Sequence, residues 1–194
     1  MNIDEKLNRI EKVIKSEPFR KDTGLGNDIP YYIFDYDPVH EIKVRKNLDD
    51  LKNKINNNSI LDFQIDEFDL YDITIEILKN KGFLEKVFKF EEKKGREKTQ
   101  IEVNKLLKIS SEDKNMIVNE IVKNTSQNSI VFITGVGKVY PIIRSHDILN
   151  NLHHYIDEIP VVLFFPGKYS GHELELFNTI KDNNYYRAFP LITE

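Results

Sequence analysis

The sequence Thr-Gly-Val-Gly-Lys, which follows an apolar run, has the residue types of a phosphate-binding loop. Glycines let backbone N–H groups approach an anion closely, and a lysine adds positive charge. A Walker A loop, however, has four residues between its glycines and a hydroxyl residue after the lysine. Here one residue separates the glycines and Val139 follows the lysine. One interpretation is therefore a phosphate site, and the other is a tight turn that needs positive φ. The candidate phosphate or nucleotide ligands are Thr134, Gly135, Gly137 and Lys138.

Two carboxylates, Asp35 and Asp37, occupy alternate positions at the end of another apolar run. Together with Asp66 or Glu67 they could hold a magnesium ion, because this hard cation prefers carboxylate oxygens. A phosphoryl-transfer or nuclease site would follow. The alternative is structural: Asp37 precedes Pro38, and this pair is typical of a helix start.

Other site chemistries find little support in the sequence. The chain has no cysteine, which excludes thiol catalysis and cysteine-ligated metals. His153 and His154 are adjacent, so they point to different faces of a helix and do not form a metal-ligating pair. No Gly-x-Ser-x-Gly elbow is present. The Gly24–Gly26 stretch precedes a strand, whereas phosphate loops follow one. We therefore predict no cofactor.

Aromatic side chains are frequent in the C-terminal part of the chain. Core packing and a sheet edge explain most of them. Some could form a partner-binding surface, because tyrosine and arginine are enriched at protein interfaces. The candidate partner-binding residues are Tyr169, Tyr185, Tyr186 and Arg187.

The elements that position these residues begin with a strand–helix–strand unit. The runs 130–133 and 161–165 are short, apolar and bounded by glycine or proline, which is typical of strands buried on both faces. Between them, Ser145 is a candidate N-cap, and apolar residues repeat every fourth position up to Ile156. Such a crossover makes the two strands parallel.

The remaining segments repeat this alternation. The patterns predict strands at 29–34, 60–65 and 185–192, and helices at 3–14, 44–55, 70–78, 116–122 and 174–180. About five strands separated by helices indicate an α/β fold, an open, mainly parallel sheet with helices on both faces. The topology is Rossmann-like or P-loop-like without a Walker A loop. We expect a single α/β domain over residues 1–194, with a helical insertion at about 83–125. Ligands of such sheets bind beyond the carboxyl ends of the strands, where the candidate residues lie.

The composition restricts the classes of function. The 194 residues are 40% hydrophobic and 31% charged, as in a soluble globular domain. No apolar run is long enough to span a membrane, and the N-terminus has no signal-peptide core, so a cytoplasmic location is expected. The net charge of −4 argues against nucleic-acid binding by the whole chain. A lysine-rich stretch at 93–98 could bind DNA, but neighbouring glutamates favour a solvated helix face instead.

Three local patterns taken together resemble the BrxB family of the BREX bacteriophage-exclusion systems. The first is Ile33-Phe34-Asp35-Tyr36-Asp37-Pro38. The second begins at Gly135-Val136-Gly137-Lys138-Val139-Tyr140-Pro141 and continues to Leu152. The third runs from Phe164-Phe165-Pro166-Gly167-Lys168-Tyr169 to Phe189. The likeness covers essentially the whole chain, and its middle third contributes least.

The resemblance implies a cytoplasmic, non-catalytic component of an antiviral defence complex. It implies protein–protein contacts, with a PglZ-type phosphatase-superfamily protein as the direct partner and other BREX subunits as further ones. No catalytic residues come with the family, so none is assigned. A nucleotide- or magnesium-binding enzyme with a site at the strand ends remains the alternative, because a shared fold does not decide function.

Overall fold

The computed structural model describes residues 1–20, 30–182, 184, 186 and 188–193. The predicted glycine stretch at 24–26 lies outside these residues. The helices are α1 (Ile3–Ile14), α2 (Glu17–Arg20), the 3-10 helix η1 (Pro38–His40), α3 (Glu41–Asn56), α4 (Leu70–Asn80), α5 (Leu84–Lys94), α6 (Arg96–Leu106), α7 (Met116–Asn124), α8 (Val136–Val139) and α9 (Ser145–Leu152). The strands are β1 (Tyr31–Tyr36), β2 (Gln64–Asp69), β3 (Ser129–Thr134), β4 (Val161–Tyr169), β5 (Leu174–Leu176), β6 (Ile180–Asp182) and β7 (Phe189–Pro190).

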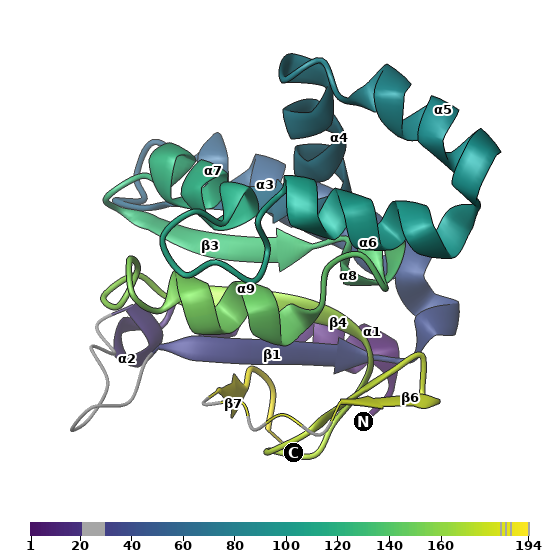
Figure 1. Ribbon diagram of the computed structural model, residues 1–194. Coiled ribbons are helices and arrows are strands. Elements are labelled where there is room, and N and C mark those ends of the chain that lie inside the picture. The colour runs from purple at the N-terminus through teal and green to yellow at the C-terminus, as the bar shows by residue number, and fades with distance from the viewer. Residues whose placement is uncertain (21–29, 183, 185, 187, 194) are drawn as a thin grey trace.

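The sheet is open and mainly parallel, which confirms the predicted fold class (Figure 1). Its order is β2-β3-β4-β1-β7, with parallel pairing throughout this path. The predicted crossover is confirmed, because β3 and β4 are parallel neighbours joined by α8 and α9. The chain passes from β1 across two strand positions to β2, which forms one edge of the sheet.

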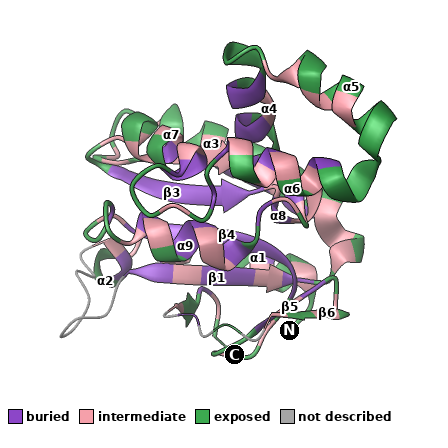
Figure 2. Cartoon of the chain, in the orientation of Figure 1, coloured by how far each residue is buried: buried purple, intermediate pink, exposed green. Residues whose placement is uncertain are grey.

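Helices cover both faces of the sheet. Alternate strand residues point to opposite faces, so Phe164 packs with α1 and α3, while Leu163 and Phe165 pack with α4, α7 and α9. The strands β3 and β4 are buried on both sides over their apolar runs (Figure 2). This explains why their sequences are continuously apolar rather than alternating.

The helices α5 and α6 form an arm that extends away from the sheet (Figure 1). Its inner part packs on the core through Val87 and the buried Val103. Its outer part is exposed, and α5 has no buried residue (Figure 2). The sequence predicts a helical insertion at about 83–125, and the turn at Gly95 makes the first part of this segment a helical hairpin.

The structure corrects the secondary structure predicted for residues 174–180. The spacing of its apolar residues predicts a short helix, but β5 and β6 form an antiparallel hairpin that extends β4. Two consecutive residues, Phe177 and Asn178, adopt positive φ in its turn. Positive φ is incompatible with a right-handed helix. The helix-like spacing arose because the two short strands each place apolar residues toward the same core.

Several predicted boundaries also differ from the structure. β2 begins at Gln64, four residues after the predicted start, and Ile60 lies in an exposed turn. α7 begins at the predicted residue, Met116, and its cap is Asn115, because the Asn115 side chain accepts hydrogen bonds from the N–H groups of Ile117 and Val118. Ser145 is the first residue of α9 rather than its N-cap. The last strand is limited to Phe189–Pro190 in the part of the chain that the structure describes.

Candidate functional site

Strand order separates the two groups of candidate carboxylates. Asp35 lies in β1 and Asp37 directly follows it, whereas Glu67 belongs to β2, and β4 and β3 lie between these strands. Thr134 and Lys138 lie at the end of β3 and in α8, next to β2. The carboxyl edge of the sheet therefore carries two separate polar clusters, one at β2 and β3 and one at β1 and β4.

The first cluster lines an open cleft of about 570 Å³ between β2, α3, α4 and α7. Six carboxylates and three cations line it, so its charge is acidic overall. The hydroxyl of Thr134 donates to Glu67 Oε1 at 3.1 Å, and Lys52 forms an ion pair with the other oxygen of Glu67. The lining residues are Arg45, Asp49, Lys52, Glu67, Phe68, Asp69, Asp72, Ile73, Glu76, Glu120, Asn124, Thr134 and Lys138.

Asp69 is the central residue of this cluster. It is the N-cap of α4, and its side chain accepts hydrogen bonds from the N–H groups of Tyr71 at 2.9 Å and Asp72 at 3.2 Å. The same carboxylate forms an ion pair with Lys138. The lysine of the candidate phosphate loop is therefore already neutralised by a carboxylate of the same chain.

The two glycines of this loop have separate packing reasons. Gly135 adopts φ +74°, in the left-handed region, and a Cβ there would lie 2.4 Å from Asp69 Oδ1. A Cβ on Gly137 would lie 2.8 Å from the ring of Phe177. Positive φ and close approach are the conditions in which only glycine fits. The Gly-Val-Gly pattern thus fits the turn interpretation, with the Asp69 carboxylate packed against Gly135.

In the first cluster a carboxylate pairs with the candidate lysine. In the second cluster a lysine pairs with a candidate carboxylate. Lys6 of α1 reaches the end of β1, where its Nζ lies 2.7 Å from Asp35 Oδ1 and 2.7 Å from the Asp35 carbonyl oxygen. The other carboxylate oxygen of Asp35 accepts a hydrogen bond from the N–H of Tyr169 at 3.2 Å. The side chain of Asp37 accepts from the N–H of Val39 and caps η1. An ammonium group thus occupies the place that the sequence suggested for a metal ion.

In each cluster one candidate ligand is paired with an opposite charge of the same chain, although the first cluster as a whole stays acidic. Asp69 faces the candidate phosphate loop, and Lys6 faces the candidate metal carboxylate. Among the residues that the structure describes, no three histidine, aspartate or glutamate side chains are placed to hold a metal ion together.

The candidate partner-binding tyrosines have structural hydrogen bonds. The Tyr169 hydroxyl donates to the carbonyl oxygen of Ala188 at 2.7 Å. Tyr186 is only 2% exposed, and its hydroxyl donates to Asp182 Oδ2 at 2.7 Å. Because its ring has almost no free surface, we leave Tyr186 out of the proposed partner surface. Tyr185 and Arg187 lie outside the described residues.

Asp182 also connects the C-terminal hairpin to α9. Its Oδ2 lies 3.1 Å from His146 Nδ1, and the opposite ring nitrogen of His146 lies 3.2 Å from Asp147. The hydrogen bonds to Asp147 and Asp182 raise the pKa of His146, and partial burial offsets only part of this rise. Burial opposes ionisation of Asp182, but hydrogen bonds from Tyr186 and His146 lower its pKa overall.

This network predicts a pH-dependent contribution to stability. Because the pKa of His146 is raised in the folded chain, its contribution is fully present below the ordinary histidine pKa of about 6.5. The contribution disappears as the pH rises through the higher folded pKa. We expect His146→Gln to lower the free energy of unfolding at about pH 5.5 and to have a much smaller effect at about pH 8.5.

Urea unfolding at a series of pH values measures this difference. His154→Gln is the matched control, since the side chain of His154 is 50% exposed and its ion-pair partner Glu112, at 3.2 Å, is 65% exposed. It should change stability little at either pH. An equal loss for His146→Gln at both pH values would show that the imidazole acts by packing rather than by charge.

Sequence reasoning missed Lys6 and Asp182 as members of these clusters. Lys6 lies on the polar face of an amphipathic helix, so no local pattern distinguishes it from its charged neighbours. Asp69 did carry a signal. It directly precedes the apolar repeat that starts at Leu70, and aspartate in that position is typical of an N-cap.

Comparison with known proteins was made on the whole chain. Residues 66–191 match the profile of the family described as BREX protein BrxB. A BREX protein BrxB from Bacillus cereus (strain H3081.97) is 49% identical over 190 residues, covering 98% of this chain and 97% of the relative. The chain belongs to the BrxB family. A second BrxB, from Escherichia coli O9:H4 (strain HS), is 29% identical over 194 residues, covering 99% of this chain and 92% of the relative.

The family match confirms the resemblance read from the sequence. The alignments with the two relatives extend over nearly the full chain, so they include the residues of both polar clusters. No solved structure gives a significant match. Among the helices described for this BrxB-family chain, none has the length and apolar character needed to cross a bilayer.

Proposed function

We propose that this BrxB-family chain is a non-catalytic component of a BREX phage-defence complex in the cytoplasm. It acts as a protein–protein adaptor and binds a PglZ-type phosphatase-superfamily partner. Family membership supports the assignment to BREX, since both relatives are named BREX protein BrxB. The choice of partner follows from the resemblance alone.

One observation carries the adaptor role. Both positions where the sequence allowed a catalytic ligand are held by side chains of the same chain, Asp69 against Lys138 and Lys6 against Asp35. A catalytic site keeps charged groups available for substrate, whereas these groups are paired with each other. The arrangement stabilises helix starts and strand ends instead of leaving a charge unbalanced.

The α5–α6 arm is the element we assign to partner contact. Phe88 is 49% exposed and Ile101 is 57% exposed on this arm. Seven basic and five acidic side chains lie between positions 84 and 106, so the arm is net positive in a chain of net charge −4. Large exposed apolar residues among basic ones favour an acidic partner surface with an apolar centre.

Co-purification tests the adaptor role. Tagged chain is expressed together with the complete defence cluster, and the proteins retained on the tag are identified by mass spectrometry. We expect the PglZ-type protein to be retained in stoichiometric amount. A purified pair that elutes separately on size exclusion at about 10 μM would contradict the proposal, because a functional complex needs an affinity near or below that concentration.

A substitution on the arm tests its assigned contact. We expect Phe88→Glu to weaken partner binding about tenfold or more, since it places a charge in the apolar part of the interface. Surface plasmon resonance with the immobilised partner measures the change. Ile42→Glu is the matched control, because Ile42 is 82% exposed on α3, outside the arm. Equal affinities of both variants and the unmodified chain would remove the arm from the interface.

The tyrosine and arginine candidates remain predictions of the sequence. Tyr169, Tyr185 and Arg187 can be added to the same binding series as alanine variants. For Tyr169 we expect some loss of stability as well, since its hydroxyl bonds to Gly171 and Ala188 carbonyl oxygens.

The alternative of a nucleotide- or magnesium-binding enzyme is favoured by the size of the first cleft and by the presence of Thr134 and Lys138 in it. Calorimetric titration with ATP or GTP and magnesium separates the two functions. The adaptor proposal expects no binding heat and no thermal shift. Micromolar binding that is lost in Lys138→Gln would favour the enzyme.

A further inference from the structure

A second pocket, of about 80 Å³, lies on the opposite side of the β3–α8 loop from the acidic cleft. It is bounded by the end of β4, by α8, by the start of α9 and by the β5–β6 hairpin, elements that Figure 1 shows around the carboxyl end of β4. Part of its wall is apolar, with Val136, Phe165, Leu174 and Ile180 among the lining residues. Carboxyl ends of strands are where open α/β sheets bind ligands.

Ser145 opens onto this pocket without a partner of its own. The residue is 6% exposed and lines the pocket. Within the described part of the chain, its hydroxyl makes no hydrogen bond. The Ser145 oxygen is not among the fully buried, unpartnered side-chain atoms of the described residues, so it is accessible and can donate a hydrogen bond to a ligand in the pocket or accept one from it.

The same position has two further features that favour an anion. Ser145 is the first residue of α9, and the side chain of the N-cap residue Arg144 makes no cap hydrogen bond. The N–H of Asp147 in the first turn bonds to the Arg144 carbonyl oxygen, whereas no hydrogen bond is found for the N–H of Ser145 among the described residues. Helix N-termini attract negative charge through their free N–H groups and the helix dipole. Arg144 and Lys181 also line the pocket, and neither forms an ion pair with any residue that the structure describes.

The one carboxylate of the lining does not neutralise these cations. Asp182 is hydrogen-bonded by Tyr186 and Asn184 and lies against His146. It is one carboxylate against the two cations Arg144 and Lys181, so the lining keeps a net positive charge. Arginine, a serine hydroxyl and a helix start together match the two oxygens of a carboxylate, since a guanidinium binds a carboxylate with two parallel hydrogen bonds.

We propose that this pocket binds a carboxylate attached to a short apolar group. The carboxylate contacts Arg144, Ser145 and the start of α9, and the apolar group fills the space between α8 and the β5–β6 hairpin. A volume of about 80 Å³ holds several water-sized groups, which suits a branched aliphatic chain and excludes a nucleotide.

Two sources can supply this chemistry, a free short-chain carboxylic acid and the C-terminal residue of a protein chain. Capture of a C-terminal carboxylate is a known mode of peptide recognition. Binding at this pocket does not depend on the adaptor role, because the pocket residues differ from those of the α5–α6 arm.

NMR titration of the full chain tests the site with four probes. These are 4-methylpentanoate and its primary amide, and N-acetyl-leucine and its amide. We expect at least one of the two acids to shift the resonances of α9 and β6, and its amide to bind about tenfold more weakly, because the amide carries no charge. Binding of both acids assigns a general carboxylate site, and binding of N-acetyl-leucine alone assigns the source to a chain terminus.

Two variants define the residues involved. Ser145→Ala and Arg144→Gln should each weaken acid binding by about tenfold while leaving the thermal midpoint nearly unchanged, since neither side chain has a described partner to lose. Arg96→Gln, on the arm, is the control and should bind like the unmodified chain. Equal binding of acids and amides, no binding of either acid at about 50 mM, a concentration well above millimolar affinities, or unchanged binding by Ser145→Ala would each overturn the proposal.

Discussion

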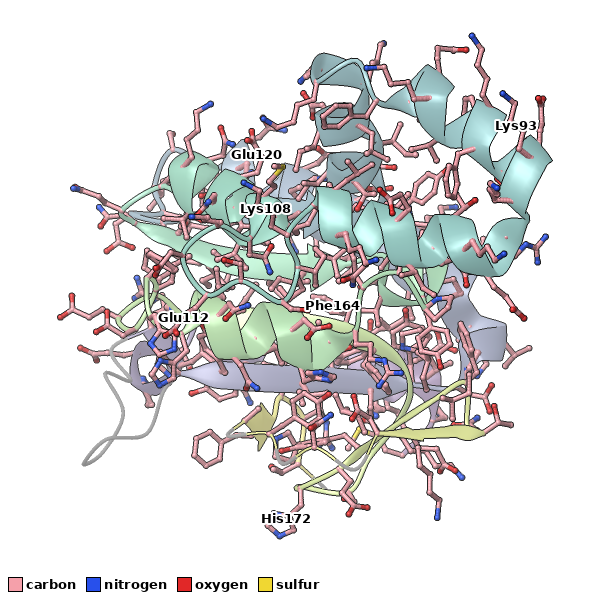
Figure 3. All side chains as sticks on the ribbon, viewed as in Figure 1. Lys93, Lys108, Glu112, Glu120, Phe164 and His172 are labelled. Atoms are coloured by element: carbon pink, nitrogen blue, oxygen red, sulfur yellow. The ribbon has the colours of Figure 1, made fainter. Side chains whose placement is uncertain are left out.

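Phe164→Ala is expected to lower the free energy of unfolding by about 3–5 kcal/mol, the range for loss of a fully buried phenylalanine. Phe164 is 1% exposed on β4, the strand between β3 and β1. The centre of its ring lies 4.8 Å from that of Phe132 and 5.5 Å from that of Phe34. Figure 3 labels Phe164. The cavity would lie at the centre of three strands, where the backbone cannot close it.

Denaturant unfolding followed by circular dichroism measures this loss. Phe189→Ala is the matched control, because Phe189 also lies in a strand next to β1 but is 43% exposed. It should lower stability by about 1 kcal/mol or less, as expected for a half-exposed edge residue. Similar losses for the two variants would mean that the core is not centred on β4.

The strands and most helices could be predicted because their signals are local. The apolar runs at 130–133 and 161–165 are continuous, and such runs are typical of central parallel strands. The β5–β6 hairpin could not be predicted. Its three-residue strands are too short for an alternating pattern, and the positive φ of Phe177 and Asn178 has no sequence signal as strong as glycine.

The arrangement of the candidate site depends on strand order, which no local pattern gives. Asp35 and Glu67 both end predicted strands, so the sequence placed them at one edge of the sheet. In the structure, however, β3 and β4 lie between the strands that carry these two residues. The sequence also did not indicate which opposite charges would pair with these carboxylates. Lys6 is 29 residues away from Asp35 in sequence and contacts it because α1 packs across β1.

Gly135→Ala is expected to lower the free energy of unfolding by about 2–4 kcal/mol. The φ of +74° adds about 1 kcal/mol for any residue with a Cβ. The remainder comes from overpacking, because the new methyl group would lie 2.4 Å from Asp69 Oδ1. Gly82→Ala separates the two contributions. Gly82 has a similar φ of +68° with nothing within 4 Å of the added Cβ, so it should lose only about 1 kcal/mol.

A double-mutant cycle that combines Gly135→Ala with Asp69→Ala shows whether the Asp69 carboxylate occupies the space beside position 135 of this loop. Asp69→Ala alone should lower stability by about 1–2 kcal/mol, because α4 loses its cap and Lys138 its partner. In the double variant the methyl group of position 135 no longer meets the carboxylate. The combined loss should therefore be smaller than the sum by about 1–2 kcal/mol. Strict additivity would mean that the loop and Asp69 do not compete for the same space, and that the close packing of Asp69 does not explain the glycine at position 135.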